Sequence, residues 1–131
     1  MILKDVIWYN KLNNKGGSKM NEQVISKVGK EVTESMLECY GDKVSKIILY
    51  GSYARGDNRE DSDMDLIVLF DRPYKEVITY RKDVSKIASR VGLKNDIMVS
   101  IVFRDLKSFN EDKDILPFYQ NIVKEGYTIY G

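Results

Sequence analysis

Two short, uninterrupted apolar segments limit what this chain can fold into. Residues 47–50 read Ile-Ile-Leu-Tyr, and residues 66–70 read Leu-Ile-Val-Leu-Phe. Apolar runs of this length, without polar alternation, are typical of buried strands. A buried strand needs other elements packed against it, so we expect a sheet covered by helices.

Helical periodicity surrounds these two strands. Apolar residues recur every four positions from Val24 to Met36, which predicts a helix that Gly41 ends. Pro73 is a favoured first-turn residue and begins a second predicted helix, which Gly92 ends. The predicted order is helix (21–40), strand (47–50), strand (66–70), helix (73–92), strand (97–103) and helix (115–124), followed by a short end at residues 127–130. This order favours an α+β fold with a small mixed β-sheet.

The 131 residues suffice for one domain. Residues 13–18, Asn-Asn-Lys-Gly-Gly-Ser, have the composition of a turn-rich linker. We therefore expect residues 1–20 to be an N-terminal appendage that could be mobile, and residues 21–131 to form the folded domain.

Composition excludes several kinds of chemistry. The chain has no histidine and one cysteine, Cys39, which excludes His-activated nucleophiles, thiolate zinc clusters and an internal disulfide. It has 21 basic and 20 acidic residues, a net charge of +1, so there is no strong nucleic-acid signal. No apolar stretch is long enough for a membrane span or a signal peptide, and we expect a cytoplasmic protein.

The segment between the two apolar strands carries the most information. Residues 51–70 hold two basic and five acidic side chains. Gly51 and Ser52 leave the first strand, and Asp63 and Asp65 enter the second. Residues i and i+2 of a strand share a face, so the two carboxylates project together and need a cation between them. Divalent metal ions shared with phosphate oxygens provide such a cation.

The same residues partly match three other patterns. An EF-hand beginning at Asp61 would need glycine and glutamate where Leu66 and Arg72 stand, so we reject it. A P-loop beginning at Gly51 would need lysine where Asp57 stands. An ordinary turn-rich connection with solvated acids stays open at this point, although it does not explain two acids at the start of an apolar strand.

The same residues resemble a known family. Gly51-Ser52, ten residues and then Asp63-x-Asp65 is similar to the signature of the DNA polymerase β-like nucleotidyltransferase superfamily. The longer pattern, Gly-Ser-x-Ala-Arg-Gly followed by Ser-Asp-x-Asp-Leu, resembles its minimal nucleotidyltransferases. These are single-domain proteins, often paired with a HEPN-domain protein as the antitoxin of a toxin–antitoxin system. The resemblance implies a nucleotidyltransferase-like fold.

The resemblance also implies a metal site. Asp63 and Asp65 would bind two magnesium ions together with a nucleoside triphosphate. The family uses a third carboxylate from a later strand, and Asp96 suits this role because it precedes the predicted strand at residues 97–103. All three aspartates would then be both catalytic residues and metal ligands.

Three further residues are implied in nucleotide binding. The Gly51 backbone and Ser52 would hold the terminal phosphates, and Arg55 is a candidate phosphate contact because guanidinium groups pair well with phosphoryl oxygens. The second predicted helix also carries four basic residues, which we expect to form a solvated face: Arg81, Lys82, Lys86 and Arg90. Tyr53, inside the motif, could stack on a base, but tyrosines in such positions are more often packing residues.

The function implied is magnesium-dependent transfer of a nucleoside monophosphate, AMP from ATP, to a hydroxyl of a partner macromolecule. A HEPN-type toxin is the partner that the resemblance points to. A non-catalytic module that neutralises a partner by binding it is the alternative, and a homo-oligomer remains open. Transfer to a small molecule is disfavoured, because the chain has no room for a second domain to hold that acceptor.

Overall fold

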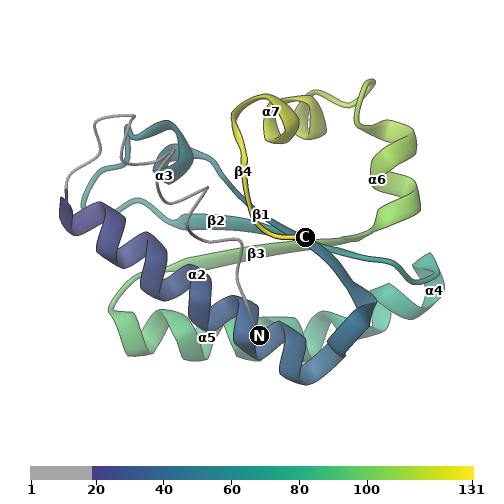
Figure 1. Cartoon of the computed structure of the whole chain (residues 1–131), viewed down its shortest axis with the longest axis horizontal. Coiled ribbons are helices and arrows are strands. Elements are labelled where there is room, and N and C mark those ends of the chain that lie inside the picture. Colours follow the sequence, from purple (N-terminus) through teal and green to yellow (C-terminus); the bar gives the residue numbers. More distant parts are fainter. Residues whose placement is uncertain (1–18) are drawn as a thin grey trace.

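The computed structural model describes residues 19–131, and describes their side chains from residue 21 on. The predicted appendage therefore falls outside the described residues, apart from the first two residues of α2. The elements, labelled as in Figure 1, are α2 (Lys19–Tyr40), η1 (Gly41–Lys43), β1 (Val44–Tyr50), α3 (Ser52–Arg55), β2 (Met64–Phe70), α4 (Tyr74–Val77), η2 (Ile78–Tyr80), α5 (Arg81–Asn95), β3 (Val99–Asp105), α6 (Leu106–Asp112), α7 (Pro117–Glu125) and β4 (Tyr127–Tyr130).

The four strands form one mixed sheet in the order β3-β2-β1-β4. The two central strands, β1 and β2, are antiparallel, and β4 is antiparallel to β1. Strand β3 is parallel to β2, because α4, η2 and α5 carry the chain back between them. The predicted α+β fold with a small mixed sheet is confirmed.

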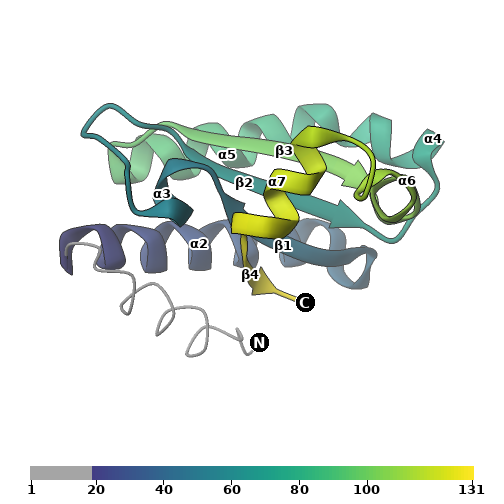
Figure 2. The same ribbon diagram turned by 90° about the horizontal axis from the view of Figure 1, so that it is seen from above.

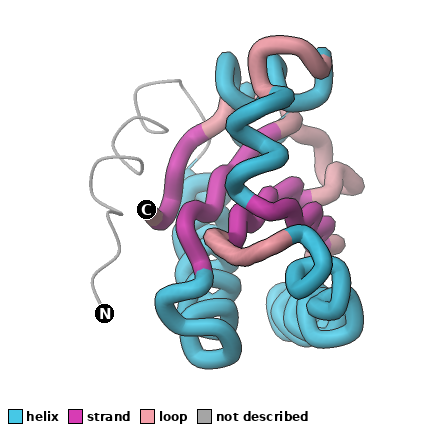
Figure 3. Tube along the Cα trace, turned by 90° about the vertical axis from the view of Figure 1, so that its right-hand side faces the viewer, coloured by secondary structure: helices cyan, strands magenta, loops and turns pink. Residues whose placement is uncertain are grey.

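Helices cover both faces of the sheet. In Figures 1 and 3, α2 and α5 lie side by side under one face, and α6 and α7 lie over the other. Strand β2 is buried on both faces, which explains its continuous apolar sequence. Met64, Leu66 and Val68 pack toward α2 and α5, whereas Ile67 and Leu69 pack toward α6 and α7.

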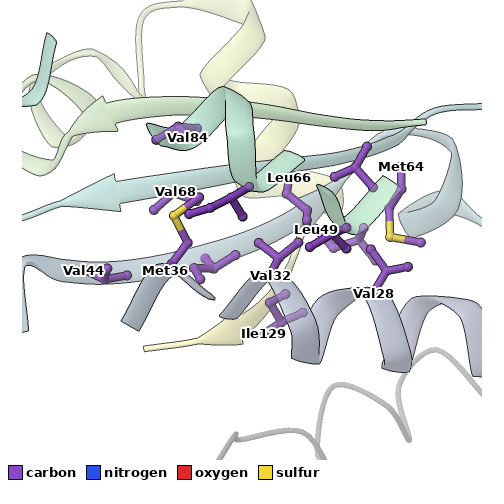
Figure 4. Close-up of a cluster of buried hydrophobic side chains, with 14 of the residues drawn as sticks. Val28, Val32, Met36, Val44, Leu49, Met64, Leu66, Val68, Val84 and Ile129 are labelled. Atoms are coloured by element: carbon purple, nitrogen blue, oxygen red, sulfur yellow. The ribbon is translucent and has the colours of Figure 1, made fainter. Parts of the chain in front are cut away.

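The larger core lies between the sheet and the pair α2 and α5 (Figure 4). The four-residue repeat of α2 places Val28, Val32 and Met36 against Leu49 and Leu66, and all five side chains are fully or almost fully buried. The smaller core lies on the other face, where one residue of α6 and two of α7 cover β1 and β2. Its buried members are Ile48, Ile67, Leu69, Phe109, Tyr119 and Ile122.

The second predicted helix is wrong in its details. The chain over residues 74–95 is divided into α4, η2 and α5, and α5 continues past Gly92 to Asn95. Gly92 has a packing role instead, since a Cβ there would lie 2.6 Å from the carbonyl oxygen of Ile97. Asp96 caps the end of α5 and adopts the left-handed conformation, with φ of 52°. The predictions omitted α6 and gave residues 127–130 no strand.

Within residues 19–131, no helix combines the length and the apolar composition that crossing a lipid bilayer requires.

The larger core predicts a sharp contrast between two helical positions. Met36→Ala should lower the free energy of unfolding by about 2–5 kcal/mol, because Met36 is fully buried and its loss leaves a cavity. Leu93→Ala on α5 is the matched control, since Leu93 is 84% exposed and should change stability by less than about 0.5 kcal/mol. Urea unfolding followed by circular dichroism measures both, and equal losses would contradict this packing.

Candidate active site

The candidate site lies where β1 ends and β2 begins. Tyr50, the last residue of β1, is the register partner of Asp65, the second residue of β2. Figure 2 shows α3 at this same end of the sheet. The start of β3 is also here, because the backbone N–H of Met64 donates to the carbonyl oxygen of Met98 at 2.9 Å. The antiparallel pairing of β1 and β2 thus brings the Gly-Ser turn and the two aspartates together.

Gly51 makes the turn that leaves β1. Its backbone has φ of 76° and ψ of −155°, a region that only glycine occupies readily. A Cβ at this position would lie 2.5 Å from Oδ2 of Asp65. The carboxylate therefore sits directly against the turn, and both the backbone conformation and the close approach require glycine.

The short helix α3 follows, and two of its side chains anchor it in the larger core. Tyr53 and Ala54 are buried in the larger core, so Tyr53 is a packing residue and is not available to stack on a base. Its hydroxyl is hydrogen-bonded to Asn58, which also accepts a hydrogen bond from Asn21 of α2 at 3.1 Å. These contacts hold α3 and Ser52 at the end of β1.

Asp63 and Asp65 form a pair of like charges. Asp65 is half-buried, and Asp63 is exposed one residue before β2 begins. Burial raises the pKa of Asp65, the charge of Asp63 raises it further, and the guanidinium of Arg55 lowers it in part. The arrangement therefore disfavours the negative charge of Asp65 unless a cation approaches, as expected for a carboxylate pair that shares a divalent ion with phosphate oxygens.

Arg55 extends from α3 toward the same side of the molecule. Its Nε lies 3.1 Å from Oδ2 of Asp57, and its Nη1 lies 3.0 Å from Oε1 of Glu125 at the end of α7. The contact with Glu125 could not be predicted from the sequence, because the two residues are 70 positions apart. Through this contact, α7 fixes the position of the guanidinium near the carboxylate pair.

An aromatic wall borders the site on the side of β1. The rings of Tyr50 and Phe118 meet edge to face, with centroids 5.6 Å apart, and Phe118 remains 43% exposed. Burial and the charge of Asp65 raise the pKa of Tyr50 to about 12, against the opposing charge of Arg104. The Nε of Arg104 donates to the hydroxyl of Tyr119 at 2.9 Å. Sequence reasoning did not assign Phe118 or Arg104 to the site.

The structure does not bring Asp96 to the aspartate pair, contrary to what the resemblance implies. Asp96 ends α5, three residues before β3, and lines a hollow of about 480 Å³ with residues of that helix. Residues 19–131 contain no group of three or more His, Cys, Asp or Glu side chains placed to hold a metal ion. The β3 residue in register with Asp65 is Ser100.

Known proteins similar to this chain are nucleotidyltransferases by name or family. The sequence profile of the nucleotidyltransferase domain family matches residues 30–129. A protein of Methanocaldococcus jannaschii with the provisional name protein adenylyltransferase is 32% identical over 111 residues, which cover 85% of this chain and 100% of the relative. A second protein of that organism, with the same kind of name, is 41% identical over 78 residues, or 58% of this chain and 75% of the relative.

Solved structures share the fold. A chain from Sulfolobus solfataricus, provisionally named a nucleotidyltransferase, matches with a TM-score of 0.57 and 22% identity over 86% of this chain and 88% of its own. A chain from a toxin–antitoxin structure with AMP-PNP matches with a TM-score of 0.53 and 24% identity over 79% of this chain and 73% of its own.

The turn predicts that Gly51→Ala is more damaging than Gly56→Ala. Both residues have positive φ, but a Cβ at Gly56 would meet open space, whereas one at Gly51 would strike Asp65. We expect Gly56→Ala to cost about 1–2 kcal/mol from backbone strain. Gly51→Ala should cost more and should also lower nucleotide affinity, because Asp65 is displaced. Urea unfolding measures the loss of stability, and calorimetric ATP titration measures the loss of affinity. Equal losses in the two variants would contradict the close approach of Asp65 to Gly51.

The raised pKa of Asp65 predicts a pH-dependent gain from Asp65→Asn. A carboxyl whose pKa is higher in the folded state binds its proton more tightly there, so stability falls as pH rises through that pKa. Asparagine removes this cost, and the variant should melt higher than the wild type at pH 7–8, with the gap closing as pH falls toward about 4. Thermal melts across this range test it. Asp61→Asn, an exposed loop position, is the charge-matched control and should show no such trend.

Proposed function

The chain belongs to the nucleotidyltransferase domain family, and we propose that it transfers AMP from ATP to a hydroxyl group of a partner macromolecule. The observation that carries this proposal is the carboxylate of Asp65, paired with Asp63 and lying against the Gly51 turn. The relative that this chain covers in full bears the name protein adenylyltransferase, which supports AMP as the transferred group and a protein as the acceptor.

The terminal phosphates of the nucleotide would lie at the start of α3. The turn at Gly51 has no Cβ to block a phosphate, and Ser52 presents a hydroxyl next to it. The first N–H groups of a helix lack intrahelical acceptors and are suited to bind anions. Arg55, held by Asp57 and Glu125, adds a positive charge within electrostatic reach of Asp65.

Asp63 and Asp65 would hold magnesium together with the triphosphate, and the closeness of their two charges fits this role. When bound, magnesium neutralises the phosphate oxygens and the leaving pyrophosphate and lowers the pKa of an acceptor hydroxyl. We give Asp96 no metal-binding role in this proposal, because it lines a hollow beside α5 and the described residues hold no cluster of three carboxylates.

The transfer exchanges one bond of the α-phosphorus for another. The acceptor oxygen forms a bond to the α-phosphorus, and the bond from that phosphorus to the bridging oxygen of pyrophosphate breaks. The acceptor proton passes to solvent. Asp63 and Asp65 would hold the α-phosphate for this attack through the magnesium that they bind, while the Gly51 turn and Ser52 would retain the pyrophosphate.

The open surroundings of the site favour a macromolecular acceptor. Asp63 is exposed, and Phe118 of α7, whose ring meets Tyr50 next to Asp65, remains 43% exposed, as does Leu116 two residues earlier. Apolar residues exposed next to a polar site are typical of surfaces that bind another protein. We propose that the acceptor is a hydroxyl-bearing residue of a HEPN-type toxin, and that AMP transfer silences this toxin.

The experiment that tests the proposal uses the protein together with the product of the gene next to its own. The two are incubated with ATP and magnesium, and the partner's mass is measured. We expect a gain of one or more AMP units. Asp65→Asn should lower the rate by at least about a hundredfold, the size typical of losing a charge-stabilising group from an active site. Asp61→Asn carries the same charge change in the exposed loop and should retain the activity.

A different result would favour the binding module. In that case, the partner would be inhibited without any change of mass, and Asp65→Asn would inhibit it as well as the wild type does. Inhibition that needs ATP, magnesium and Asp65 together supports the transferase.

A further inference from the structure

The register of three neighbouring strands places one residue beside the aspartates that the proposed mechanism does not use. Tyr50 of β1 is the partner of Asp65, and Asp65 is the partner of Ser100 in β3. Register partners in a sheet project on the same face. Tyr50, Asp65 and Ser100 therefore form one row across the end of the sheet, on the face that α6 and α7 cover farther along.

Ser100 is the polar residue that β3 contributes to this row. Its neighbours on the same face, by the alternation of side chains along a strand, are Val102 and Arg104. Val102 packs against the smaller core, and Arg104 bonds Tyr119 and the carbonyl oxygen of Phe103. Ser100 itself is half-buried and lies directly beside Asp65.

In this row, β3 therefore contributes the hydroxyl of Ser100 next to the carboxylate that β2 contributes with Asp65. In the described part of the chain, no third carboxylate joins the pair, and Asp96 lies on the α5 side of the sheet. A site with two carboxylates attracts a divalent ion less strongly than a site with three. A serine hydroxyl can donate a hydrogen bond to a phosphate oxygen, whereas a carboxylate would repel it.

We propose that Ser100 takes the position beside Asp65 on β3 in the active site, and that its hydroxyl binds an α-phosphate oxygen of the nucleotide. This inference rests on the proposed nucleotide transfer. It makes the metal site a two-carboxylate site that fills only together with the nucleotide, because the remaining metal ligands come from the phosphates. It also means that β3 supplies no base for the acceptor hydroxyl.

Ser100→Asp tests the position of Ser100 without any acceptor. Placed beside Asp65, the new carboxylate should raise the affinity for manganese in the absence of nucleotide by about tenfold or more, as calorimetry measures it. Ser100→Asn is the control, because asparagine has nearly the same size as aspartate but no charge. Without metal, the aspartate variant should melt lower than the asparagine variant because of like-charge repulsion, and manganese should reverse the order. Equal manganese affinity in the two variants would overturn the inference.

Two further variants test the contact with phosphate. Ser100→Ala should weaken the binding of magnesium-ATP by about tenfold, the typical effect of losing a hydrogen bond to a charged group, and Ser100→Thr should restore it. Asp96→Asn should leave manganese and ATP binding unchanged. Unchanged ATP affinity in Ser100→Ala, or weakened binding in Asp96→Asn, would overturn the proposal. These titrations need no partner, so they remain decisive even if AMP transfer to a toxin is never observed.

Discussion

The contact between Gly51 and the carboxylate of Asp65 is the constraint on which the site depends. It exists because β1 and β2 pair antiparallel with Tyr50 opposite Asp65, so that the turn leaving one strand faces the carboxylate entering the other. A shift of one residue in this register would turn Asp65 into the larger core and expose the apolar residues beside it. The buried faces of β2 thus determine where Asp65 lies relative to Gly51, since the cores on both sides of the sheet are compatible with only one register.

Two layers of helices have different tasks around this sheet. The long helices α2 and α5 cover one face along its length and form most of the core. On the other face, α6 and α7 form the smaller core, and Asp65 and Ser100 lie at the edge of this core, in one row with Tyr50. Asp65 is half-buried there. This intermediate position disfavours its charge without excluding a ligand, as a site that binds cations and phosphates requires.

Much of this arrangement could be predicted from the sequence, because it follows from local patterns. The helical repeat from Val24 to Met36 and the apolar runs of β1 and β2 specify their elements directly. The Gly51 turn and the pair Asp63 and Asp65 were predictable from their spacing. The residue opposite Asp65 could not be predicted in the same way, because it depends on the pairing of β2 with β3, and the position of Asp96 before a strand does not specify that pairing. The link from Arg55 to Glu125 could not be predicted either, since only the tertiary fold joins them.

Strand β4 has a consequence for the order in which the enzyme becomes competent during synthesis. It supplies the second neighbour of β1, and the residue two positions before it, Glu125, holds Arg55 beside the site. Both contacts join segments that are far apart in the chain, so β1 and α3 leave the ribosome well before their partners exist. A nascent chain that already displays both aspartates still lacks the cover of β1 and the anchor of Arg55. The site is therefore assembled only after residues 117–130 have emerged, which delays nucleotide chemistry until the domain has folded as a unit.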